Sequence, residues 1–293
     1  MEGHMKRNSI KILTAILAAL LLFSSCINPQ KEEESTTLDD LGDVDQNSIG
    51  SYKKTQYQYL TNVDVTLLTT NLSGEYLILV NKQNELGQEY APASLTTLTC
   101  DTSYSMNLET RAAQALYAML AEMRAAGVSD ISVTSAYRSY EQQVTTYNKH
   151  LQYEQSCISL DAYRVFGNDY IKMNYLDKKI FKLNNEDAKI VAQSYSAKPG
   201  QSEHQTGLCV DFITSDMGDE LSEAFEGTAA FAWLTENAYK FGFILRYPKE
   251  KESITGYIYE PWHYRFVGRE AATDIHNGGM TLEQYLLLTN QAQ

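Results

Sequence analysis

The sequence predicts an α+β fold in which a small, mainly antiparallel sheet is flanked by helices. An amphipathic helix comes first, because apolar residues recur at helical spacing between residues 108 and 123 and Gly127 follows as a stop signal. Short apolar segments typical of strands cluster later, at residues 207–212, 243–247 and 257–259. Helices followed by clustered strands are typical of this class, and we expect the sheet to carry the functional site.

The N-terminus predicts an exported protein. Three basic residues precede an apolar run over residues 12–23, which is too short to span a membrane and has the length of a signal-peptide core. The run ends in Phe23-Ser24-Ser25-Cys26, which resembles a bacterial lipobox. We therefore expect residues 1–25 to be removed and Cys26 to receive a diacylglyceryl group, so that the protein is a lipoprotein anchored outside the cytoplasmic membrane.

Composition indicates how the rest of the chain is organised. Residues 26–70 begin with charged and polar residues and show no sustained periodicity, which predicts a flexible spacer. Residues 71–293 are long enough to bury one core of their own. The net charge of −13 makes nucleic acid a poor partner, and we expect a monomer.

The cysteines allow few cross-links. Beyond Cys26, the chain holds Cys100, Cys157 and Cys209, so at most one disulfide can form among them. Cys209 lies in a predicted strand, where we interpret it as a small core residue rather than as a thiolate ligand.

A strand-to-helix junction around Arg138 predicts a binding position. Residues 131–135 alternate as a strand, and Ser139 with Gln142 forms a capping box that opens a helix. The Arg138 guanidinium at this junction can hold a terminal carboxylate through two hydrogen bonds, and Gln143 can reach the same group. The alternatives are that Arg138 pairs with a nearby acidic residue and that Gln143 is a solvated helix residue.

Two short segments together supply a metal site. One is Ser202-Glu-His204-Gln-Thr-Gly207-Leu-Cys209-Val-Asp211, and the other is Glu260-Pro-Trp-His263-Tyr-Arg265. An aspartate within a short buried strand is costly unless it is paired or bound to a cation. Two imidazoles and one carboxylate form a complete ligand set for a catalytic zinc with an open fourth position. His204, Asp211 and His263 are therefore the predicted ligands.

Glu260 is the predicted general base. It is too close in sequence to His263 to be a comfortable fourth ligand, yet near enough to take a proton from a water that zinc activates. If residues 260–267 are extended, His263 and Arg265 share one face. We expect Arg265 to orient Glu260 or a ligand, and Tyr137 to lie beside the site. The opposite face would carry the core residues Trp262, Tyr264 and Phe266.

A structural explanation of the same residues stays open. Asp211 could bridge Arg265 or Arg138 in a buried ion pair. His4, His150 and His276 are interpreted as ordinary surface or core histidines.

Three motifs, taken in their order along the chain, resemble those of the zinc D-alanyl-D-alanine carboxypeptidases of the VanY type. They are Ser135-Ala-Tyr137-Arg138-Ser139-Tyr-Glu-Gln-Gln143 and the two metal segments. These enzymes are related to the zinc domains of lysostaphin-like peptidases and hedgehog proteins. The resemblance implies a hedgehog/DD-peptidase-like fold, with Zn²⁺ as cofactor and a peptidoglycan stem peptide as substrate. It also implies the site roles: zinc ligands at His204, Asp211 and His263, a base at Glu260, and a grip on the substrate's end by Arg138, Gln143 and Ser202.

The implied reaction is removal of the terminal D-alanine by a D,D-carboxypeptidase. Residues 150–191 are longer than the family's usual connection and predict an insertion, either a lid or wall of the cleft or a surface excursion. An L,D-carboxypeptidase or an endopeptidase acting on the same wall peptides remains an alternative, as does a non-catalytic zinc module that binds peptidoglycan.

Overall fold

The computed structural model describes residues 44–157, 185–218 and 220–289. Cys26, the predicted leader and the centre of the predicted insertion lie outside these residues. One compact unit comprises Thr36–Lys149 and Gln193–Gln293, and a second includes His150–Ala192, the stretch in which the sequence predicts an insertion. Helices α4 (Tyr140–Cys157) and α8 (Asn185–Tyr195) cross the boundaries between the two units.

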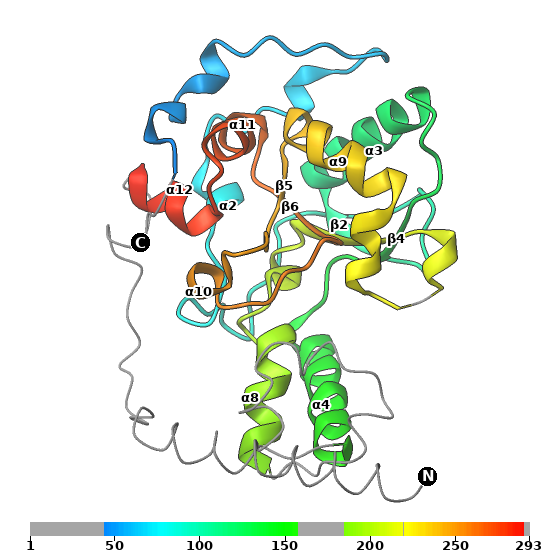
Figure 1. Ribbon diagram of the computed structural model, residues 1–293, viewed down its shortest axis with the longest axis vertical. Helices are drawn as coiled ribbons and strands as arrows, with labels where there is room; N and C mark the ends of the chain where they lie inside the picture. Colours follow the sequence, from blue (N-terminus) through cyan, green and yellow to red (C-terminus); the bar gives the residue numbers. More distant parts are fainter. Residues whose placement is uncertain (1–43, 158–184, 219, 290–293) are drawn as a thin grey trace, which may run out of the picture. The chain divides into compact units, whose positions relative to one another are not determined.

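The larger unit is built on a four-stranded sheet (Figure 1). Its strands are antiparallel in the order β3-β4-β6-β5. Their bounds are β3 Ser132–Ser135, β4 Cys209–Ile213, β6 His263–Phe266 and β5 Phe243–Leu245. A separate antiparallel pair consists of β1 (Leu95–Thr97) and β2 (Asn107–Glu109). The predicted α+β class is confirmed.

Helices cover the sheet through two apolar clusters. α3 (Thr110–Ala125) and α9 (Ala229–Asn237) contribute to the larger cluster, together with Tyr264 and Phe266 of β6. α11 (Arg269–Gly278) and α12 (Leu282–Leu288) form the smaller cluster with Ile244 of β5. Two further short helices are α2 (Gly74–Leu77) and α10 (Glu252–Thr255).

The predicted alternation of β6 is confirmed. Tyr264 and Phe266 lie in the larger apolar cluster with Trp262 packed against it, while His263 and Arg265 project from the other face. The predicted strand at residues 257–259 is wrong. Its backbone bonds irregularly instead, with the Ile258 N–H donating to Ser194 O. Tyr257 and Tyr259 are both buried, so burial alternates as in a strand although these residues form no strand-to-strand hydrogen bonds of a β-ladder.

The predicted spacer needs a correction at its C-terminal half. Residues 44–70 carry three 3-10 helices and lie on the larger unit. Their backbone is held by carboxylates: Asp274 accepts hydrogen bonds from the Gly50 and Tyr52 N–H groups, and Glu122 accepts them from Leu60 and Thr61. Residues 44–70 therefore belong to the folded domain that the sequence predicts only from residue 71.

Within the parts of the chain that the structure describes, no helix has the length and apolar character needed to span a membrane.

Candidate active site

Sheet register brings the two predicted metal segments together. Asp211 of β4 pairs directly with His263 of β6. His204 lies in a 3-10 helix, Glu203–Thr206, that ends at Gly207 in the left-handed conformation with φ of 66°. A Cβ at Gly207 would lie 3.0 Å from Pro92 Cγ, so glycine suits this turn on two grounds. The turn leads the chain directly into β4 and leaves His204 facing Asp211.

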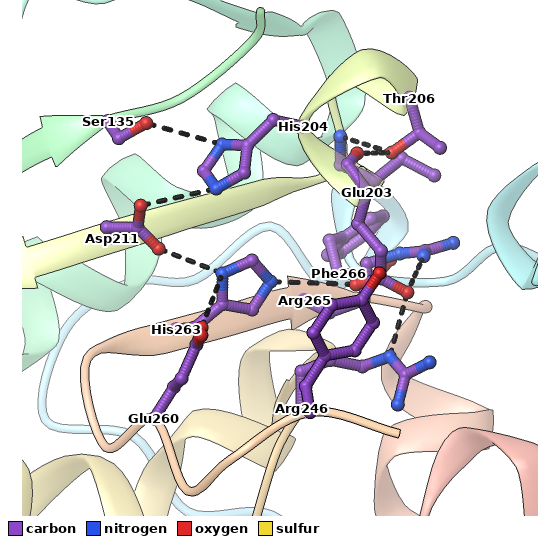
Figure 2. A network of polar contacts seen from close by, with 12 residues as sticks. Ser135, Glu203, His204, Thr206, Asp211, Arg246, Glu260, His263, Arg265 and Phe266 are labelled. Carbon is purple, nitrogen blue, oxygen red and sulfur yellow. Dashed lines mark hydrogen bonds and ion pairs between the residues drawn. The ribbon is translucent and has the colours of Figure 1, made fainter. Parts of the chain in front are cut away.

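The three predicted ligands converge and are buried (Figure 2). Asp211 Oδ2 lies 3.2 Å from His204 Nε2, and its Oδ1 lies 2.9 Å from His263 Nδ1. The other nitrogen of His204, Nδ1, lies 2.6 Å from Ala136 O. Each histidine therefore presents one ring nitrogen to the same carboxylate.

The structural explanation of Asp211 is not supported. Arg265 contacts Glu203 instead, and within the described ranges Asp211 forms ion pairs with His204 and His263. A buried carboxylate between two imidazoles needs a positive charge. Two neutral imidazoles and a carboxylate are the hard and borderline donors that a catalytic zinc prefers, so the residues present fit the ion.

Glu260 lies beside the ligands. Its Oε2 is 3.9 Å from His263 Nδ1, and the residue is buried. Burial raises the pKa of Glu260 to about 8, and the negative charge of Asp211 adds to that rise. Its carboxyl group can therefore both take up and return a proton near neutral pH.

Arg138 and Tyr137 lie at the wall of a cavity of about 420 Å³ that also includes Ser135. Ser135 Oγ is 3.4 Å from His204 Nδ1, so one wall residue of the cavity contacts the His204 ring on the edge that faces away from Asp211. The buried Nε of Arg138 has no hydrogen-bond partner among the described residues. The predicted capping box is confirmed, since the Ser139 N–H donates to Gln142 Oε1 and the Gln142 N–H donates to Ser139 Oγ.

Gln143 and Ser202 are buried rather than solvated. The side-chain amide of Gln143 donates to Ala197 O at 2.7 Å, while its Oε1 lacks a hydrogen-bond partner within the described part of the chain. Ser202 precedes the 3-10 helix that carries His204. The reading of Gln143 as a solvated helix residue is therefore wrong.

Arg265 could act on Glu260 or a ligand only indirectly. Its guanidinium does not contact Glu260 or a predicted ligand; Nη1 donates to Glu203 Oε1 at 2.7 Å. Arg246 donates to the same oxygen at 2.8 Å and to both carboxylate oxygens of Glu283. Burial alone would raise the pKa of Glu203, but the charges of Arg246 and Arg265 outweigh it and hold the pKa well below its usual range.

Glu203, Arg246 and Glu283 were missed by sequence reasoning. One signal was available: Arg265 was predicted on the metal-facing side of a buried strand, where it needs an acidic partner, and Glu203 directly precedes a predicted ligand.

Cys209 also faces the cluster. Its Sγ and nitrogens of His204 and His263 all lie within 4.8 Å of one another, and the thiol is free. Cys100 is free as well. The sequence correctly predicts that Cys209 is buried in the core, but it does not predict that the thiol lies close to both histidines.

The fold and the site together define a zinc peptidase. Two imidazoles and a carboxylate can hold the metal, with a separate carboxylate and a guanidinium close by. The chain belongs to the VanY family of D-alanyl-D-alanine carboxypeptidases, whose model matches residues 105–269.

Relatives and solved structures agree with this assignment. YodJ of Bacillus subtilis is 35% identical over 260 residues, which cover 87% of this chain and 82% of that protein. The structure of the LD-carboxypeptidase LdcB, 34% identical, matches with a TM-score of 0.57 over 72% of this chain and 86% of that one. A mutant of the D,D-pentapeptidase VanY in complex with Zn(II) is 34% identical, with a TM-score of 0.53 over 72% of this chain and 99% of that one.

Proposed function

We propose that the protein is a zinc-dependent D,D-carboxypeptidase that removes the terminal D-alanine from peptidoglycan stem peptides. The observation that carries this proposal is the convergence of His204, Asp211 and His263 around one buried point, with Glu260 beside it. Arg138, at the wall of a cavity whose residue Ser135 contacts His204, gives the substrate's terminal carboxylate a partner.

Each residue has a separate task. When bound by His204, Asp211 and His263, zinc supplies Lewis acidity to the scissile carbonyl and lowers the pKa of a water. Glu260 takes a proton from the attacking water and returns it to the leaving amine. Arg138 holds the terminal carboxylate and so measures the distance from the peptide's end to the scissile bond. Gln143 and Ser202 line the same end of the substrate.

The test is mass spectrometry of purified muropeptides after incubation with residues 27–293. Loss of one alanine from the pentapeptide alone, abolished by a chelator and restored by zinc, is the expected result. Loss from the tetrapeptide would instead make the enzyme an L,D-carboxypeptidase, the activity named for LdcB. Cleavage inside the stem or the cross-bridge would reveal an endopeptidase, and intact substrates with stoichiometric zinc would reveal a binding module.

We also propose that the enzyme works at the outer face of the cytoplasmic membrane, anchored through Cys26. The support is the leader with its lipobox-like end, Phe23-Ser24-Ser25-Cys26. Labelled palmitate should be incorporated into the protein in bacteria, and Cys26→Ser should abolish incorporation. Labelling of Cys26→Ser at the level of the unaltered protein would remove this part of the proposal.

A further inference from the structure

One buried carboxylate close to the ligands has no part in the chemistry above. The side chain of Glu203 is fully buried, with 0% exposed. Its Oε1 accepts hydrogen bonds from Arg246 Nε at 2.8 Å and Arg265 Nη1 at 2.7 Å. Two guanidinium groups on one oxygen fix the direction in which the other oxygen points.

That other oxygen faces His263 (Figure 2). Glu203 Oε2 lies 3.6 Å from His263 Nε2, and neither atom has a hydrogen-bond partner among the described residues. Buried polar atoms are rarely left unpaired, and here two such atoms face each other just beyond hydrogen-bonding distance. A small shift of the imidazole ring would join them.

The opposite edge of the same ring faces the ligand cluster. His263 Nδ1 lies 2.9 Å from Asp211 Oδ1 and 3.9 Å from Glu260 Oε2. A metal between these groups must bind Nδ1, which requires the ring proton to be on Nε2. His204 has the opposite arrangement, because Ala136 O can only accept a hydrogen bond and so keeps the proton of that ring on Nδ1.

We propose that Glu203 is a positioning residue that holds the proton of His263 on Nε2 and turns Nδ1 toward the metal. Metal-binding histidines are commonly oriented through their second nitrogen in this way. Arg265, which donates to Glu203, is itself fixed because it also donates to Tyr76 O and Ile78 O. This inference rests on the ligand set of the proposed function.

Glu203→Gln tests the idea because it reverses one hydrogen bond. The arginines require an oxygen, so the amide NH₂ group would face His263 Nε2 and favour the proton on Nδ1, where it blocks the metal. We expect zinc affinity, measured by competition with a chromogenic chelator, to fall by about 10- to 100-fold. With zinc saturating, kcat should fall more than KM rises.

Glu283→Gln is the matched control. It removes a carboxylate of the same buried network without touching His263. Both variants should lower the melting temperature, but Glu283→Gln should keep zinc affinity within about threefold. Equal zinc affinities in the two folded variants would overturn the proposal.

A measurement on the unaltered protein covers the case in which Glu203→Gln fails to fold. Nitrogen NMR of the ¹⁵N-histidine-labelled, zinc-loaded protein should show opposite tautomers, with the proton on Nε2 of His263 and on Nδ1 of His204. A proton on Nδ1 of His263 would overturn the inference. Full zinc affinity in His204→Ala or Asp211→Ala would instead refute the ligand set of the proposed function. Failure of the proposed function can therefore be told apart from failure of the role proposed for Glu203.

Discussion

Two regions of the larger unit depend on buried or partly buried charged side chains and use them differently. In the first region, backbone N–H groups of the N-terminal segment, residues 44–71, donate to both carboxylate oxygens of Glu122, Glu270 and Asp274, which lie elsewhere in the chain. In the active site, by contrast, buried atoms of Glu203, His263 and Arg138 lack hydrogen-bond partners among the described residues.

The difference separates structural from functional use of charge. A carboxylate whose oxygens accept hydrogen bonds from the backbone of a distant segment fixes that segment in place, so we expect its effect to be on stability. An unpaired charged or ionisable group next to the predicted metal ligands can still bind a substrate or orient a neighbouring ligand, at some cost in stability. Substitutions in the first region should lower stability and spare turnover, whereas substitutions in the second should lower zinc affinity or turnover, whatever their effect on stability.

The largest effect is expected for Glu260→Ala. Removing the general base should lower kcat by about 10²- to 10⁴-fold, while zinc content stays near one per chain because the three ligands remain. Steady-state hydrolysis of pentapeptide and metal analysis check both parts. Glu236→Ala, which removes an exposed glutamate of α9, is the control and should match the unaltered enzyme. Normal turnover in Glu260→Ala would take Glu260 out of the mechanism.

Arg138→Ala should have the next largest effect. Loss of a bidentate, charge-assisted contact to the terminal carboxylate should reduce kcat/KM by about 10²-fold. The matched substrate is the same pentapeptide with a C-terminal carboxamide. If Arg138 holds the carboxylate, the substitution and the amide should not be additive, whereas additive losses would contradict the clamp.

Asp274→Ala addresses the structural region. Asp274 accepts from Gly50 N at 2.7 Å, Ser51 Oγ at 2.9 Å and Tyr52 N at 3.1 Å. The free energy of unfolding in urea should fall by about 1.5–3 kcal/mol, with kcat/KM unchanged at 25 °C. Asp101→Ala is the control, because its ion pair with Arg124 is exposed and should contribute at most about 1 kcal/mol. A loss of zinc affinity in Asp274→Ala would break the separation between the regions.

The same contrast explains what the sequence could predict. Capping boxes and the β6 alternation depend on neighbours within a few residues, so the box of Ser139 with Gln142 was foreseeable. The box that opens α12, Thr281 with Gln284, follows the same local rule. The association of His204 with Asp211 was foreseeable for the same reason. Glu203, Arg246 and Glu283 come together only through tertiary packing. Residues 44–70 look like a spacer because their backbone is bonded to distant carboxylates, an interaction that apolar periodicity does not detect.

The smallest effect is expected for Cys209→Ala. This substitution tests whether the thiol has a structural role or takes part in metal binding. Cys209 lies within 4.8 Å of ligand nitrogens, so a thiolate could close the fourth metal position, but a closed tetrahedral site is structural rather than catalytic. If the thiol only fills space on β4, alanine should change kcat/KM and zinc affinity by less than about threefold. Chelator competition and pentapeptide hydrolysis measure both quantities. A tenfold loss of zinc affinity with faster turnover would instead identify Cys209 as a ligand that must be displaced before substrate binds. The Cys209 thiolate would then stabilise the metal site and also limit its activity.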